Sequence, residues 1–168
     1  MNELSLHILD ICQNSIKANS TLIEIIITED TYHNLFEIII KDNGCGMSDK
    51  TLSEVADPFF TTRTTRKIGL GVSLFKMAAE MTEGSFDIQS KVDIGTTVKA
   101  VFNHNHIDRA PLGLIEETIC ILVLNEANID IYYKHSFNSQ TFIFDTREVK
   151  KVLDGISFTN FDVIMWIK

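Results

Sequence analysis

Apolar and polar positions repeat along this chain with two different periods, and the points where the period changes divide it into elements. Apolar residues recur every three or four positions over residues 3–18, which predicts an amphipathic helix. β-Branched runs over residues 21–28 and 35–41 predict two strands, joined as a hairpin in an antiparallel or mixed sheet. Ser48 then stands at an N-cap position before a short helix that runs to Val55.

The rest of the chain continues with the same two periods. The expected elements are a helix from the glycines at 69–71 to about Thr82, strands at 85–90 and 96–102, a helix at 112–124, strands at 129–134 and 140–144, and helices at 147–153 and 161–167. Pro111 and the polar residues before it resist helix and indicate a boundary. We therefore expect two domains, residues 1–103 and residues 104–168, the second a small C-terminal α+β extension of unknown role. Three aromatic side chains of this extension fit either a core or a docking face: Phe142, Phe144 and Trp166.

Composition excludes several classes of partner. The 168 residues are 45% hydrophobic with a mean hydropathy of +0.08, which is enough for a buried core. The net charge of -8 argues against a nucleic-acid-binding surface. No apolar run reaches the length of a membrane span, and the first residues do not resemble a signal peptide. Three scattered cysteines, Cys12, Cys45 and Cys120, predict reduced thiols in the cytoplasm and no zinc site.

One stripe of the first helix is polar. Four side chains recur at spacings of three, four and three residues and therefore point the same way: His7, Asp10, Asn14 and Lys17. The stripe is either the solvated edge of a surface helix or the wall of a site for a polar ligand. In the second case Asn14 offers an oxygen to Mg²⁺, which takes few protein ligands, and Asp10 orients a water. We expect His7 at the rim of that site.

The run Asp-Asn-Gly-Cys-Gly-Met at residues 42–47 follows the second strand directly. Glycine accepts positive φ and lets a flat ligand approach the main chain. Asp42 is placed to accept a hydrogen bond from an exocyclic amine, with Gly44 and Gly46 forming the floor beside it. An ordinary turn between two elements is the alternative.

Residues 56–68 lack helical or strand periodicity and contain three cations in an otherwise acidic chain: Arg63, Arg66 and Lys67. Such a cluster suits phosphate oxygens. The segment 69–72 opens the next helix, where unpaired N–H groups and the helix dipole favour an anion. A solvated loop followed by a tight turn is the alternative.

Four blocks thus stand in order: an Asn on a polar helical stripe, Asp-x-Gly-x-Gly after a strand, Gly-Leu-Gly before a helix, and Gly-Thr-Thr before a strand. This order resembles the Bergerat-fold ATP-binding superfamily of DNA gyrase, MutL proteins, sensor histidine kinases and anti-sigma-factor serine kinases. Residues 9–18 resemble the N box of this superfamily, and residues 42–47, 69–71 and 95–97 resemble its three glycine boxes. Residues 57–63 resemble the phenylalanine motif of histidine kinases. The resemblance implies an α+β fold, a two-layer α/β sandwich whose mixed sheet carries helices on one face.

The resemblance also implies a role for each matching residue. Asp42 would bind the adenine amine, Asn14 would hold magnesium, and Asp10 would act as a base. The nucleotide-binding residues carried over in this way are Asn14, Lys17, Asp42, Gly44, Gly46, Met47, Phe60, Arg63, Gly69, Leu70, Gly71, Val72 and Thr97. The implied cofactors are ATP and Mg²⁺.

Three departures from the superfamily pattern distinguish its branches. The gyrase and MutL branches place Glu four residues before the Asn, where this chain has the shorter Asp10. Those ATPases have Asp at the position of Lys17, and the lysine found here resembles the kinases instead. Lys67 replaces a glycine of the second glycine box, so the lid is short. None of the five histidines lies in the motif of a phosphoacceptor.

The sequence therefore favours a cytoplasmic Mg·ATP-binding protein that transfers phosphate to a partner protein, as anti-sigma-factor kinases do. Two alternatives stay open: a slow ATPase, and a non-catalytic binding module gated by ATP. We expect no nucleic-acid or membrane partner. The phosphoacceptor is unidentified, and a homodimer is left open.

Overall fold

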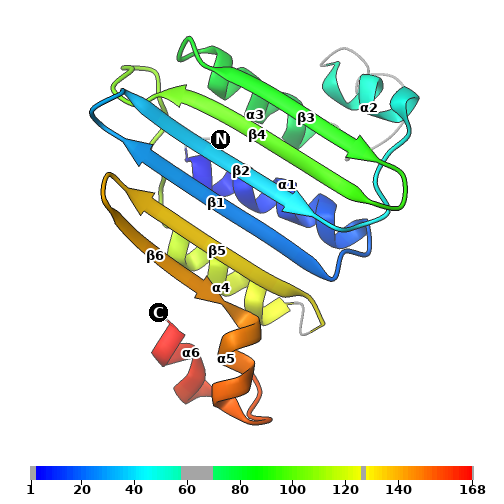
Figure 1. Ribbon diagram of the computed structural model, residues 1–168, viewed down its shortest axis with the longest axis vertical. Helices are drawn as coiled ribbons and strands as arrows, with labels where there is room; N and C mark the ends of the chain where they lie inside the picture. Colours follow the sequence, from blue (N-terminus) through cyan, green and yellow to red (C-terminus); the bar gives the residue numbers. More distant parts are fainter. Residues whose placement is uncertain (1–2, 58–69, 126–127, 168) are drawn as a thin grey trace.

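The computed structural model describes residues 3–57, 70–125 and 128–167. In chain order the elements are α1 (Leu4–Lys17), β1 (Leu22–Asp30), β2 (Leu35–Asp42), α2 (Asp49–Ala56), α3 (Leu70–Glu80), β3 (Ser85–Lys91), β4 (Gly95–Asn103), α4 (Ile115–Asn125), β5 (Asp130–Phe137), β6 (Gln140–Asp145), α5 (Thr146–Leu153) and α6 (Phe161–Ile167). One six-stranded sheet has the order β3-β4-β2-β1-β5-β6, and α1, α3 and α4 cover one of its faces (Figure 1). The expected α+β fold with a mixed sheet is confirmed.

The predicted hairpin is the centre of this sheet. β1 and β2 pair antiparallel, with Ile25 opposite Ile40 and Ile27 opposite Ile38. These four side chains are almost completely buried, because alternate residues of a strand point to the same face and this face meets the helices. Full burial of one isoleucine stabilises the fold by about 1.5–3 kcal/mol, so this block is a main source of stability.

The sheet continues across the expected domain boundary. β5, from beyond residue 104, pairs parallel with β1 over its whole length, from Leu22 opposite Asp130 to Glu29 opposite Phe137. On the helical side, Ile119 and Leu122 of α4 belong to the same buried core as the hairpin. The division at residue 103 remains a prediction, and both segments contribute to one sheet and one core.

The first turn of α1 is held by the chain that precedes α4. The N–H of Leu4 donates to the carbonyl of Pro111 at 2.9 Å, and the N–H of Ser5 donates to the carbonyl of Leu112 at 2.8 Å. Gly113 follows with φ of +79°, a conformation that glycine adopts without strain. This segment therefore satisfies donors that every helix leaves unpaired at its start. It also explains why α4 begins at Ile115, later than the predicted residue 112.

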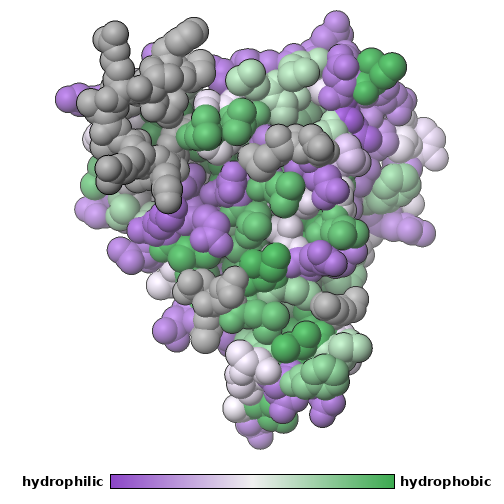
Figure 2. Space-filling view, turned by 180° about the vertical axis from the view of Figure 1, so that it is seen from behind, coloured by the Kyte–Doolittle hydropathy of each residue, from purple (hydrophilic) through white to green (hydrophobic). Residues whose placement is uncertain are grey.

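The aromatic residues of the last elements are mostly at the surface. Phe142 is 60% exposed and Trp166 is 62% exposed, whereas Phe144 packs against the core. Figure 2, which views the molecule from its helical side, shows apolar side chains gathered toward the end that carries α5 and α6. Of the three aromatics left open by the sequence, only Phe144 packs against the core, and it is half-buried there. Within the described ranges, no helix combines the length and the apolar character that a membrane crossing requires.

Candidate functional site

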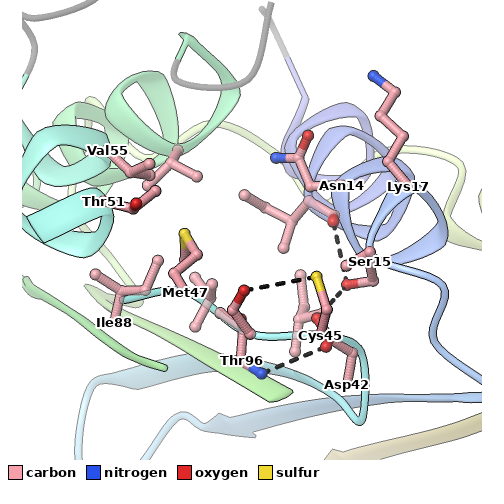
Figure 3. Close-up of a pocket in the computed structure, with 16 residues that line it drawn as sticks. Asn14, Ser15, Lys17, Asp42, Cys45, Met47, Thr51, Val55, Ile88 and Thr96 are labelled. Carbon is pink, nitrogen blue, oxygen red and sulfur yellow. Dashed lines mark hydrogen bonds between the residues drawn. The ribbon is translucent and has the colours of Figure 1, made fainter. Parts of the chain in front are cut away.

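A cavity of about 240 Å³ lies between α1, α2 and α3 and the sheet strands β2, β3 and β4. Seven apolar side chains form its walls: Ile11, Ile40, Met47, Val55, Val72, Ile88 and Val98. The polar groups lie at its ends, with Asp42 at the base and with Asn14 and Lys17 of α1 at the opposite side (Figure 3). An apolar slot with a few placed polar groups fits a flat heteroaromatic ligand.

Asp42 ends β2 at the base of this cavity and is only 9% exposed. Its Oδ2 accepts a hydrogen bond from Ser15 Oγ at 2.6 Å. Its Oδ1 accepts from the N–H of Gly44 at 2.9 Å and from the N–H of Thr96 at 3.3 Å. Three donors from three parts of the chain therefore hold this carboxylate in one orientation.

The turn after Asp42 is packed too closely for side chains at its glycines. A Cβ on Gly44 would lie 2.7 Å from Ser20 Oγ and 2.8 Å from Ala18 Cβ. Gly46 has φ of +64°, and a Cβ there would collide with the carbonyl of Lys91. The turn is thus wedged between the end of α1 and the β3–β4 hairpin, which positions its backbone beside the cavity.

Of the two threonines after Gly95, the structure places Thr96 in the cavity wall and not Thr97. Thr96 lies opposite Asp42, and its Oγ1 hydrogen-bonds Ser90 Oγ at 2.8 Å. Thr97 is paired with Lys41, so it lies on the other face of the sheet. The expectation that Thr97 assists base binding therefore differs from the structure, because a shift of one residue in a strand reverses the face.

The polar stripe of α1 divides into a buried part and an open part. His7 is 3% exposed and stacks on Phe75 of α3 with ring centroids 5.4 Å apart. Burial lowers the pKa of His7 from its usual value. The prediction that His7 lies at the rim is wrong, because α3 packs directly against that part of α1.

The open part of the stripe faces a second hollow of about 200 Å³ next to the cavity. Asp10, Gln13, Asn14 and Lys17 line it from α1, and Leu70, Gly71 and Leu74 line it from α3. Asn14 and Lys17 line both hollows, so the two lie side by side along α1. A Cβ on Gly71 would lie 3.1 Å from Asp10 Cβ, so the glycine lets the first turn of α3 approach the acid.

The structure therefore brings most of the sequence-predicted site residues together around these hollows. Asn14, Lys17, Asp42, Gly46, Met47 and Val72 line the cavity, Asp10, Leu70 and Gly71 line the second hollow, and Gly44 supports the turn. Phe60, Arg63 and Gly69 lie outside the described residues. Sequence reasoning missed Gln13, Ser15, Cys45 and Thr51, and it carried over Thr97 where the structure has Thr96. Helical spacing could have found Gln13, which lies three residues after Asp10 and four before Lys17 on α1.

The side chains around the two hollows indicate which kind of metal ion the site could hold. Within the part of the chain that the structure describes, no group of three or more His, Cys, Asp or Glu side chains is arranged to hold a metal. Asn14, between the apolar cavity and the open hollow, could offer a neutral amide oxygen to a metal ion. Magnesium commonly binds one or two protein oxygens and takes its other ligands from water and substrate phosphates. The residues present thus fit a magnesium ion that arrives with a phosphorylated ligand.

A protein-family model described as "Histidine kinase-, DNA gyrase B-, and HSP90-like ATPase" matches residues 2–106. The chain belongs to this ATPase family. All the residues around the cavity and the second hollow fall inside the matched range. The chain is thus an ATP-binding domain of the kind found in histidine kinases, and its resemblance to the Bergerat-fold superfamily is confirmed at that level.

Similar curated proteins are much longer than this ATPase-family chain. It is 37% identical over 97 residues to a "Putative sensor protein" of Shewanella frigidimarina, covering 56% of this chain and 15% of the relative. It is 27% identical over 93 residues to "Sensor histidine kinase YvrG" of Bacillus subtilis, covering 53% of this chain and 16% of the relative. The chain therefore spans about one sixth of the length of these relatives.

A solved structure with the same fold is titled "Crystal Structure of N terminal domain of a DNA repair protein". It superimposes with a TM-score of 0.57 at 16% sequence identity, covering 85% of this chain and 52% of the other. At this identity the likeness shows the fold alone. Its coverage exceeds the range of the family model, so part of the fold similarity extends into the C-terminal segment.

Proposed function

We propose that this domain binds Mg·ATP across the two hollows and transfers the γ-phosphoryl group to a partner protein, in the manner of anti-sigma-factor kinases. The observation that carries the proposal is the placement of a fixed carboxylate, Asp42, at the base of an apolar slot whose other side holds Asn14 and Lys17. This arrangement matches the two ends of a nucleotide, an aminopurine base and a charged phosphate tail.

The base would occupy the aliphatic cavity. Its exocyclic amine would donate to Asp42, and its faces would lie against Met47, Ile88 and Val98. Because these walls are apolar, burial of the ring supplies affinity while the single carboxylate supplies orientation.

The phosphates would extend toward the second hollow. Lys17 supplies positive charge there, and the first turn of α3 at Leu70 and Gly71 offers backbone N–H groups to an anion. Asn14 would hold magnesium, which neutralises the phosphate oxygens when it is bound. Phe60, Arg63 and Gly69 stay predicted contributors to this end of the site.

Asp10 would act as the base of the transfer. The acceptor oxygen forms a bond to the γ-phosphorus, the bond from that phosphorus to the β–γ bridging oxygen breaks, and ADP leaves. The proton of the acceptor hydroxyl passes to the Asp10 carboxylate, which is exposed in the second hollow beside Gly71. Positioning and charge neutralisation supply most of the rate enhancement in such reactions.

Kinase chemistry is supported by the kinase-like Lys17 and by sensor histidine kinases among the similar proteins. A slow ATPase is the second candidate, because the exposed Asp10 could equally accept a proton from water. An ATP-gated binding module is the third candidate. We assign the protein to the cytoplasm, which is consistent with Cys12, Cys45 and Cys120 forming no disulfide.

Incubation with γ-labelled ATP and cell extract tests the proposal. We expect one defined labelled protein band that disappears with Asn14→Ala. Asn160→Ala, an exposed position near α6, is the matched control and should leave the label unchanged. Release of labelled phosphate without a labelled protein would indicate the ATPase. Binding of ATP without a labelled protein and without released phosphate would indicate the gated module. If the protein bound no ATP in a manner that depends on Asn14, the whole proposal would be overturned.

A further inference from the structure

The hydrogen bonds of Asp42 leave this carboxylate one open acceptor position. A carboxylate offers about four acceptor positions, two on each oxygen. Oδ1 uses both of its positions, on the N–H groups of Gly44 and Thr96. Oδ2 uses one position on Ser15 Oγ at 2.6 Å. The remaining position is on Oδ2, the oxygen that the Ser15 hydroxyl holds.

Ser15 can serve Asp42 only as a donor. It is 3% exposed, it lines the cavity, and its single hydroxyl proton has two oxygens within reach. The Asp42 oxygen is at 2.6 Å, whereas the carbonyl of Ile11 is at 3.4 Å, so the proton lies on the short bond. The oxygen of Ser15 therefore presents only lone pairs to the cavity.

The neighbouring hydroxyl is also engaged. Thr96 Oγ1 lies 2.8 Å from Ser90 Oγ, which in turn accepts from the N–H of Met47 at 2.8 Å. Beside Asp42, the polar base of the cavity thus presents lone pairs of Asp42 Oδ2 and of Ser15 Oγ, because the Ser15 proton is committed to the carboxylate. A ligand group that donates hydrogen bonds fits there, and a ligand group that only accepts is repelled.

We infer that Ser15 is a specificity-determining positioning residue, which holds the free acceptor of Asp42 toward a 6-amino purine and against a 6-oxo purine. The inference rests on the proposed nucleotide site and extends it to a residue that takes no part in the chemistry. The inference depends on one contact: the buried hydroxyl of Ser15 lies 2.6 Å from Oδ2 of Asp42, the carboxylate oxygen that has an open acceptor position. Without this hydroxyl the carboxylate keeps its two backbone donors but loses the contact that aligns Oδ2.

Calorimetry with two nucleotides tests the inference. ATP and inosine triphosphate carry the same sugar and phosphates and differ at the 6-position and N1 of the purine. Ser15→Ala should raise the dissociation constant of Mg·ATP about tenfold, the scale of one lost alignment contact. It should leave the dissociation constant of Mg·inosine triphosphate unchanged, because the 6-oxo group that replaces the amine has no hydrogen to donate to the aligned acceptor. Alanine also preserves the helix, since it is the best helix former.

Two further variants separate positioning from a general structural effect. Ser5→Ala removes an equally buried hydroxyl from the same helix, at the end away from the cavity, and should change neither constant. Ser15→Thr retains the hydroxyl and should restore most of the preference for ATP. Equal weakening of both nucleotides by Ser15→Ala, or no change in either, would overturn the inference while leaving the ATP site in place. If the unsubstituted protein binds neither nucleotide, the proposed function fails and the inference fails with it.

Discussion

Replacing Asp42 with asparagine exchanges one oxygen for an amide nitrogen at the base of the cavity while keeping the size of the side chain. The amide oxygen can take the place of Oδ1, toward the N–H groups of Gly44 and Thr96. The amide nitrogen then faces Ser15, whose hydroxyl can turn its proton to the carbonyl of Ile11 and accept instead. Fold stability should therefore fall by only about 1–2 kcal/mol, the difference between charged and neutral hydrogen bonds.

Nucleotide binding should suffer more than stability. The second amide hydrogen occupies the position where the open acceptor of Asp42 stood, so an adenine amine meets a donor instead of an acceptor. Loss of one charge-assisted hydrogen bond with an unpaired donor left behind costs about 2–3 kcal/mol, which is about 30- to 150-fold in the dissociation constant. Calorimetry with Mg·ATP measures this change, and thermal unfolding checks that the variant is folded.

The matched control is Asp87→Asn, an exposed acid on β3 that accepts a hydrogen bond from Gln89. It should bind Mg·ATP as the unsubstituted protein does. If Asp42→Asn were folded and bound Mg·ATP with an unchanged dissociation constant, the assignment of this carboxylate to the base would be refuted.

Three other outcomes follow from buried groups. Burial lowers the pKa of His7, so on acidification the unfolded chain takes up a proton before the folded chain does. The free energy of unfolding should therefore fall below pH 6.5, by at most about 1.4 kcal/mol per pH unit. Urea titrations at several pH values should show a flatter slope for His7→Phe, which also removes a buried Nδ1 that has no hydrogen-bond partner among the described residues. Gly46→Ala should cost about 2 kcal/mol or more and weaken Mg·ATP binding, whereas Gly155→Ala, with φ of +88° and open space around it, should cost less and leave binding intact; similar losses in both would contradict the wedged turn. Residues 1–103 alone should melt at a lower temperature than the full chain by circular dichroism, because β1 loses its partner β5, and an unchanged melting temperature would show that the C-terminal segment is dispensable for the core.

Local sequence patterns identified nearly all the helices and strands, because the formation of a helix or strand depends largely on residues that are close in the sequence. The isoleucines of β1 and β2 alternate as a half-buried hairpin must, and Ser48 caps α2 by accepting a hydrogen bond from the N–H of Thr51. Asp42 was singled out because glycines at alternate positions follow this acid at a strand end, and because the other blocks of the chain favour a ligand site over an ordinary turn.

Features that depend on distant partners were not visible in this way. Helical spacing showed that His7 shares a face with Asp10, but only the packing of α3 on α1 decides that His7 is buried and Asp10 open. The choice between Thr96 and Thr97 depends on the strand register with β2, which one sequence does not encode locally. The parallel pairing of β5 with β1 joins segments separated by most of the chain, and no period in either segment specifies that partner.

This parallel pairing also sets the order in which the molecule can be completed on the ribosome. β1 ends at Asp30, whereas the strand that covers its second edge begins only at Asp130. Until then a row of isoleucines beside open backbone groups is available to other chains, which is a known route to aggregation of nascent proteins. β5 therefore protects the edge of β1, and translation speed or chaperone capture over the interval between them should govern the yield of folded protein.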